Sequence, residues 1–149
     1  MKKTYILMIA KNFLATHPRK GQPTNFKEKI LDKEKIHTIR HNYAHWEKVA
    51  KEVNAGTAVL VLKEWTGRPY HSKQSEIMRL EKIGLQSVIF GFYNYVDCNV
   101  NDDSQLLVML QKLAENDGLT KEDFIAWFGK PDPKEKYAII HFTDFIYKF

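Results

Sequence analysis

Cysteine and long apolar runs are scarce in this chain of 149 residues. The single cysteine, Cys98, excludes an intramolecular disulfide framework and a zinc site built from several cysteines, and it favours a reducing compartment. No segment of the sequence approaches the roughly 20 apolar residues of a membrane-spanning helix. The basic start, MKKTYILMIAKNF, is interrupted by Lys11 and Asn12, and no A-x-A cleavage pattern follows. We therefore predict a first β-strand in a cytoplasmic protein with no membrane partner.

The motifs of several common catalytic sites are also missing. The sequence has no glycine-rich phosphate loop, no G-x-S-x-G elbow and no H-E-x-x-H motif. Two of the six histidines, His41 and His45, have the i, i+4 spacing of ligands on one helical face. However, His41 precedes the predicted helix, and the sequence suggests no third ligand. We predict no metal and no cofactor.

The composition predicts one packed domain over residues 1–149. Hydrophobic residues make up 44% of the chain and aromatic residues 13%, which is enough for a buried core at this length. The 23 lysines and arginines against 18 acidic residues give a net charge of +5 and a pI near 9.2. This balance favours anionic partners, with nucleic acid first among them.

Hydrophobic periodicity and turn residues predict a series of strands interrupted by short helices. Strands are predicted over 4–10, 57–65, 75–83, 85–95 and 137–142, and helices over 24–31, 43–54, 102–115 and 120–128. Thr24 is expected to cap the first helix, whose apolar side carries Phe26, Ile30 and Leu31. Thr120 is expected to open the last helix with a capping box that ends at Asp123. The strands are separated by hairpin-like turns and lack the regular strand–helix alternation of a doubly wound fold. This order favours an α+β protein with a mostly antiparallel sheet or small barrel and helices at its ends.

Residues 35–40, Lys-Ile-His-Thr-Ile-Arg, combine polar side chains with two isoleucines. Buried lysine and arginine need partners, so the mixture suggests polar groups held against an apolar wall at the mouth of a site. On a strand, Thr38 and Arg40 would share a face roughly 6–7 Å apart. Lys35 would join them only if the chain turned near residues 34–37. The alternative is a strand entrance with solvated basic residues.

The segment Trp65-Thr-Gly-Arg-Pro-Tyr-His-Ser-Lys-Gln74 follows the strongest predicted strand. Trp65 and Tyr70 are suited to stacking on a base, while Arg68 and Lys73 are suited to phosphate, as in single-stranded nucleic-acid binding. The alternative is a hairpin turn whose aromatic rings pack on the edge of the core and whose charges are solvated. The sequence leaves both interpretations open.

Residues 26–31, FKEKIL, form a short predicted helix and are followed by 35–40, KIHTIR, which has the spacing K-x-x-T-x-R. This pattern resembles the helix–loop–strand signature of the ASCH family of the PUA-like superfamily of small β-barrels. Residues 115–120, ENDGLT, look like the glutamate segment of small bacterial amidohydrolases of N4-acetylcytidine. Residues 137–142 resemble the family's closing strand, whereas 64–105 have no counterpart.

The resemblance implies a small PUA-like, mixed or antiparallel β-barrel with short helices at its ends. It also implies a catalytic set of a lysine, a threonine and a glutamate, which falls on Lys35, Thr38 and Glu115. In this scheme Thr38 attacks the acyl carbonyl, a neutral Lys35 takes its proton, and Glu115 holds the base edge or protonates the leaving amine. Arg40 and His37 complete the expected binding surface.

Three hypotheses follow for function. The first is recognition of RNA or a modified nucleoside, extended to acyl-amide hydrolysis on N4-acetylcytidine. The second is a non-catalytic RNA-binding module in which Lys35, Arg40, Arg68 and Lys73 contact phosphate. The third is a protein-interaction domain that uses aromatic side chains such as Trp65, Tyr70 and those of the helix around Trp127. The first hypothesis predicts that Lys35, Thr38 and Arg40 converge on one cavity, with Glu115 nearby and the 65–74 segment at its border.

Overall fold

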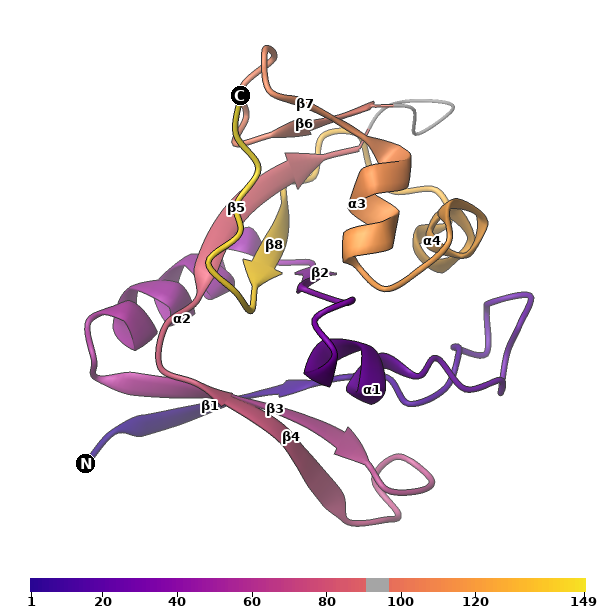
Figure 1. The fold of residues 1–149 in the computed structure, drawn as a ribbon, viewed down its shortest axis with the longest axis vertical. Coiled ribbons are helices and arrows are strands. Elements are labelled where there is room, and N and C mark those ends of the chain that lie inside the picture. The colour runs from indigo at the N-terminus through magenta and orange to yellow at the C-terminus, as the bar shows by residue number, and fades with distance from the viewer. Residues whose placement is uncertain (91–96) are drawn as a thin grey trace.

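The computed structural model describes residues 1–90 and 97–149. Within them the chain forms an α+β fold, as the sequence predicts, with short helices between strands (Figure 1). The elements are β1 (Lys3–Met8), α1 (Phe26–Leu31), β2 (His37–Arg40), α2 (Tyr43–Asn54), β3 (Ala58–Trp65), β4 (Gln74–Leu80), β5 (Gly84–Ile89), β6 (Asp97–Val100), β7 (Leu107–Met109), α3 (Leu110–Asn116), α4 (Lys121–Phe128) and β8 (Tyr137–His141).

The strands form two sheets (Figure 1). The smaller has the order β1-β3-β4, with β1 parallel to β3 and β3 antiparallel to β4. The larger has the order β2-β8-β5-β6-β7 and is antiparallel throughout. After β4 the chain passes directly into β5 and so changes sheet. Strand pairing among the described residues thus gives two sheets and no closed barrel.

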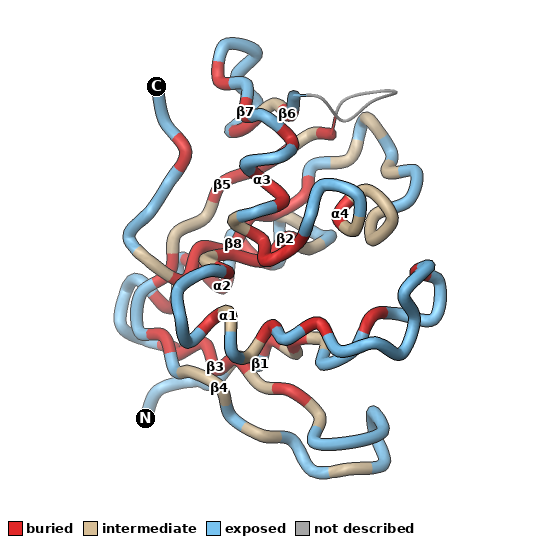
Figure 2. Tube along the Cα trace, turned by 45° about the vertical axis from the view of Figure 1, so that its right-hand side comes forward, coloured by how far each residue is buried: buried red, intermediate tan, exposed pale blue. Residues whose placement is uncertain are grey.

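Helix α2 joins the two sheets through its apolar side. Trp46, Val49, Ala50 and Val53 are buried, as their helical spacing predicts. The helix contacts β3 in one sheet and β5 and β8 in the other. Figure 2 shows that buried residues concentrate in the middle of the molecule, whereas the outer loops are exposed. None of the described helices is long and apolar enough to cross a membrane.

The connection between α1 and β2 positions the basic segment. The chain turns at residues 32–34, slightly before the turn predicted near 34–37. The N–H of Ile36 then donates to the backbone oxygen of Asn116 at 2.8 Å, which ties this connection to the end of α3. Lys35 is therefore placed beside the loop between α3 and α4.

The start and apolar side of the first helix differ from the prediction. The N-cap is Asn25, which adopts a positive φ of 60°, rather than Thr24. The Thr24 hydroxyl instead donates to the backbone oxygen of Ala10 at 2.8 Å, because the preceding loop folds back against the end of β1. Leu31, expected on the apolar side, is exposed, while Phe26 and Ile30 are buried.

The predicted helix over 102–115 is wrong in its first half. A turn at residues 101–106 connects β6 to β7, neither of which was predicted, and α3 begins only at Leu110. Asn101 and Asp102 both adopt positive φ, which a helix cannot continue through. In β7 the side chains alternate, with Val108 buried between two exposed neighbours. The spacing of the apolar residues in this leucine-rich run fits both a helix and a strand, so the sequence pattern alone did not distinguish them.

The remaining elements agree with the prediction to within a few residues. The predicted strand over 75–83 ends earlier, at Leu80, because the chain leaves the smaller sheet there. Of the predicted strand over 85–95, the part over 91–95 lies outside the described residues. Thr120 caps α4 as predicted, accepting a hydrogen bond from the N–H of Asp123 at 3.1 Å.

Candidate functional site

A cavity of about 680 Å³ opens between the end of β1, strand β2, the loop after β3 and the segments around α4. Its lining includes both polar groups and aromatic rings. The lining residues that carry the argument are Lys35, Thr38, Arg40, Trp65, Tyr70 and Asp117. Five of these six were predicted site residues, and the convergence of Lys35, Thr38 and Arg40 was itself predicted.

Strand β2 presents Thr38 and Arg40 on its cavity side. The Arg40 Nε donates a long hydrogen bond of 3.4 Å to Thr38 Oγ1. The Arg40 guanidinium also donates to the backbone oxygen of Met8 at 2.8 Å, which fixes it against the end of β1. The intervening Ile39 is buried in the core. Alternation along one short strand therefore supplies a hydroxyl and a fixed cation to the same cavity.

Lys35 is buried against Asp117. Its Nζ donates to the Asp117 backbone oxygen at 2.6 Å and to Oδ1 at 3.2 Å, and lies 4.3 Å from the centre of the Phe26 ring. Burial lowers the pKa of the Lys35 amine, and the charge of Asp117 acts in the opposite direction. Arg40 and Lys29 lower that pKa further. The site thus contains a lysine whose neutral form is favoured by burial.

Asp117 lies at the C-terminal end of α3 and is almost fully buried. Its Oδ1 accepts hydrogen bonds from Lys35 and from His37 Nδ1, the latter at 3.1 Å. Gly118 follows with a positive φ of 82°, and a Cβ at that position would lie 3.0 Å from the Lys35 Cβ. A glycine is needed there for Lys35 and Asp117 to approach each other.

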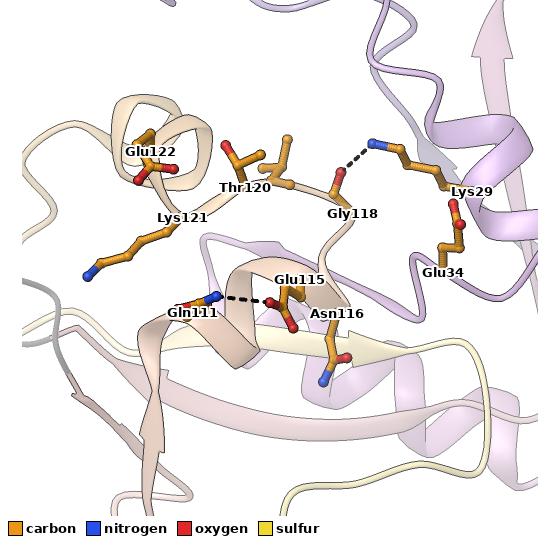
Figure 3. A pocket seen from close by; sticks show the side chains of 10 residues that line it. Lys29, Glu34, Gln111, Glu115, Asn116, Gly118, Thr120, Lys121 and Glu122 are labelled. Atoms are coloured by element: carbon orange, nitrogen blue, oxygen red, sulfur yellow. Dashed lines mark hydrogen bonds between the residues drawn. The ribbon is translucent and has the colours of Figure 1, made fainter.

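Glu115 occupies a different place from the one expected. It is exposed and accepts a hydrogen bond from Gln111 at 3.2 Å in a second cavity, beside Lys121 at the start of α4 (Figure 3). Side chains on a helix are rotated by about 100° per residue, so residues two positions apart face nearly opposite directions. Asp117, not Glu115, is therefore the carboxylate that contacts Lys35 in this cavity.

His37 was expected to contact a ligand but faces the opposite side of β2 from Thr38. It is fully buried, with Nδ1 near Asp117 and Nε2 at 2.7 Å from the Tyr147 hydroxyl. Alternation along the strand already separates it from Thr38 and Arg40. His37 therefore belongs behind the cavity wall.

The 65–74 segment borders the same cavity, as predicted. Trp65 and Tyr70 both line the opening, with ring centroids 5.1 Å apart, and Tyr70 is 85% exposed. Arg68 and Lys73 are exposed and lie outside the cavity lining. The segment therefore combines an aromatic pair at the opening with two solvated cations beside it.

Three groups around the cavity were not assigned to it from the sequence. Asp117 could have been found from the Asp-Gly pair that ends α3, because such a pair is typical of a tight chain reversal. Glu135 accepts a hydrogen bond from His41 at 2.7 Å on the rim. Trp127 packs against Phe26 at a centroid distance of 5.7 Å and forms part of the apolar wall.

The cavity offers polar groups for the edge of a planar ligand and apolar groups for its faces. One wall carries an amine, a guanidinium, a hydroxyl and a carboxylate, and the remainder is largely aromatic or aliphatic but also includes His41, Lys130, Asp132 and Glu135. Among the described residues no group of three or more histidine, cysteine, aspartate or glutamate side chains is placed to hold a metal ion. Comparisons of the chain with models of protein families, with curated proteins and with solved structures find no match.

Proposed function

We propose that the chain is an ASCH-type, PUA-like domain that binds a nucleoside or a single-stranded RNA element in this cavity. The observation that carries the proposal is the convergence of Lys35, Thr38, Arg40 and Asp117 on one wall of a cavity with aromatic rings at its opening. The two sheets and short helices of the α+β fold are compatible with a PUA-like arrangement, whereas the described strands form no closed barrel.

The polar wall matches the edge of a nucleobase. Both hydrogen bonds to the Asp117 carboxylate go to Oδ1, and Oδ2 has no hydrogen-bond partner among residues 1–90 and 97–149. An exocyclic amino group, such as that of cytosine, would donate to Oδ2. Lys35 and Arg40 would donate to the ring acceptors or to a phosphate, and Tyr70 would stack on the base.

The proposal extends to hydrolysis of an acyl amide on N4-acetylcytidine. Thr38 Oγ1 would attack the acetyl carbon and pass its proton to a neutral Lys35 Nζ. The bond between the acetyl carbonyl carbon and N4 would then break as N4 takes the proton from the Lys35 ammonium. Water activated by the same amine would hydrolyse the acetyl-threonine ester, which releases acetate and restores the hydroxyl.

The surroundings of Lys35 are compatible with this role. A neutral amine has two N–H donors and one lone pair. The two contacts with Asp117, to the backbone oxygen and to Oδ1, would use both donors and leave the lone pair for the Thr38 proton. Asp117 would replace Glu115 as the carboxylate of the catalytic set.

The same contacts favour a second candidate, a non-catalytic RNA-binding module. Both acceptors around the Lys35 Nζ also suit a charged ammonium, and a charged Lys35 cannot accept a proton from Thr38. In that case Arg40 would contact the phosphate backbone in the cavity, and Arg68 and Lys73 would contact it from the adjoining loop.

Incubation with N4-acetylcytidine, followed by chromatography for cytidine and acetate, tests the enzymatic proposal. We expect turnover by the wild-type chain, reduced turnover by Thr38→Ser, which keeps a hydroxyl, and none by Thr38→Ala. Equal product from the wild-type chain and Thr38→Ala would overturn hydrolysis of that substrate.

The RNA-binding candidate is tested by the salt dependence of binding to a single-stranded RNA. Phosphate contacts weaken steeply as salt rises, and Lys73→Ala should reduce the slope of log K against log salt by about one unit. Binding that is independent of salt would contradict this candidate.

A further inference from the structure

The C-terminal segment after β8 runs back along β5 (Figure 1). Tyr147 within this segment is buried. The Gln86 side chain fixes the Tyr147 backbone from both sides: its Nε2 donates to the Tyr147 oxygen at 2.9 Å, and its Oε1 accepts from the Tyr147 N–H at 2.8 Å. His141 Nε2 lies 2.9 Å from the same Oε1. The position of the tyrosine is therefore set by buried hydrogen bonds.

The Tyr147 hydroxyl belongs to a chain of hydrogen bonds that ends at the candidate site. Asn116 Nδ2 lies 3.0 Å from the hydroxyl, the hydroxyl lies 2.7 Å from His37 Nε2, and His37 Nδ1 lies 3.1 Å from Asp117 Oδ1. Each of these four residues is thus held by the next. The chain connects the C-terminal segment to the wall of the cavity.

Simple donor and acceptor chemistry gives this chain a single direction. An ionised carboxylate only accepts, so His37 Nδ1 must donate to Asp117. In a neutral imidazole Nε2 then accepts, so the Tyr147 hydroxyl donates to it, and the hydroxyl oxygen accepts from Asn116. Burial lowers the pKa of His37 and raises the pKa of Tyr147, which keeps both groups in these neutral forms.

We propose that Tyr147 is a positioning residue for the candidate site: it fixes the orientation of the His37 ring, whose tautomer is set by Asp117, and His37 in turn orients the Asp117 carboxylate. With Oδ1 held by His37 and Lys35, Oδ2 is the oxygen left for a ligand. The importance of this orientation for binding rests on the proposed function, whereas the orientation itself does not.

The wild-type tautomer of His37 is the first test and needs no variant. Long-range ¹H–¹⁵N correlation of the imidazole should show protonated Nδ1 and unprotonated Nε2. In Tyr147→Phe, which removes one hydroxyl, we expect Nδ1 to stay protonated because Asp117 still accepts from it, whereas the ¹⁵N shift of Nε2 and the ¹³Cγ shift of Asp117 should change. Tyr5→Phe is the matched control, because it removes a hydroxyl that bonds Glu52 far from this chain, and it should leave both signals unchanged.

Two results would overturn the proposal. One is a wild-type His37 protonated on Nε2. The other is a Tyr147→Phe spectrum in which the Asp117 signal is unchanged while the melting temperature falls. The second result would mean that the hydroxyl stabilises the fold without positioning the carboxylate.

A binding measurement connects the positioning role to the site. Tyr147→Phe should weaken cytidine binding about three- to tenfold, as expected for the loss of one hydrogen bond. The effect should largely vanish in an Asp117→Asn background, because both changes act on the same carboxylate. If the wild-type chain binds no cytidine, the proposed function fails, and the His37 spectra still decide whether Tyr147 positions Asp117.

Discussion

The Nζ of Lys35 lies 2.6 Å from the backbone oxygen of Asp117 and 3.2 Å from its Oδ1, although the two residues are 82 positions apart in the sequence. This contact joins the connection before β2 to the loop between α3 and α4. It places the Asp117 carboxylate beside Lys35 in the candidate cavity and leaves Glu115 in a separate cavity (Figure 3).

The two carboxylates provide a matched pair of variants. Asp117→Asn should weaken cytidine binding roughly tenfold or more, because a hydrogen bond to a charged group contributes more than one to a neutral group. Glu115→Gln, two residues away and exposed, should bind as the wild-type chain does. Titration calorimetry on both variants measures the difference. Equal losses of cytidine affinity in the two variants, or a loss confined to Glu115→Gln, would contradict this assignment of the site.

Tyr70 provides a test of stacking at the opening. Because its ring is 85% exposed, Tyr70→Ala should leave the melting temperature nearly unchanged. Stacking on a base contributes about 1–3 kcal/mol, so binding of RNA or nucleoside should weaken roughly five- to a hundredfold. Phe149→Ala removes an equally exposed ring, at 86%, outside this cavity, and should bind normally. A lower melting temperature with unchanged binding would assign Tyr70 to the edge of the core.

Gly118 tests the close approach of Lys35. Gly118→Ala and Gly56→Ala both place a side chain at a positive φ, 82° and 84°, and each should cost about 1–2 kcal/mol of unfolding free energy. A Cβ at Gly56 meets no atom within 4 Å, whereas at Gly118 it meets Lys35 at 3.0 Å. Urea unfolding should therefore show about 1 kcal/mol or more of additional loss for Gly118→Ala. Equal losses would mean that Lys35 moves aside freely.

The lowered pKa of His141 predicts how the free energy of unfolding depends on pH. Burial, with a smaller effect of His37, lowers the pKa of His141 from 6.5 to about 3. Between these values the unfolded chain binds a proton that the folded chain does not, so this contribution to stability is complete above pH 6.5 and falls as pH decreases towards 3. From pH 7 to about pH 5 the loss should be about 2 kcal/mol.

The variant that checks this is His141→Gln, which cannot take up that proton. Urea unfolding at both pH values should show a smaller loss for His141→Gln than for the wild-type chain. His37, whose pKa is also lowered by burial, acts in the same direction and should account for part of the loss that remains. Identical pH dependence in the two proteins would show that His141 does not contribute.

The elements that the sequence predicts well are those with strong local signals. Helix α2 has a full apolar stripe, and Thr120 has a capping partner three residues ahead in Asp123. Alternation along β2 also correctly placed Thr38 and Arg40 on one face. These features depend on neighbours in the sequence, so a single chain is enough to predict them.

The errors at the site come from longer-range effects. The leucines before α3 fit a helix and a strand equally well, so the start of the helix was misplaced and the orientation of its end could not be derived. That orientation decides between Glu115 and Asp117. Alternation along β2 already places His37 on the other face from Thr38, but its contact with Tyr147, which is 110 residues away, is encoded by no local pattern.

The central claim is that the cavity lined by Lys35, Thr38, Arg40 and Asp117 binds a nucleoside. The most direct test is a titration of the ¹⁵N-labelled chain with cytidine, in which the amide resonances of the protein are monitored by NMR. We predict saturable shifts that include Thr38, Arg40 and Tyr70. The absence of saturable shifts, or shifts confined to the cavity beside Glu115 and Lys121, would contradict it.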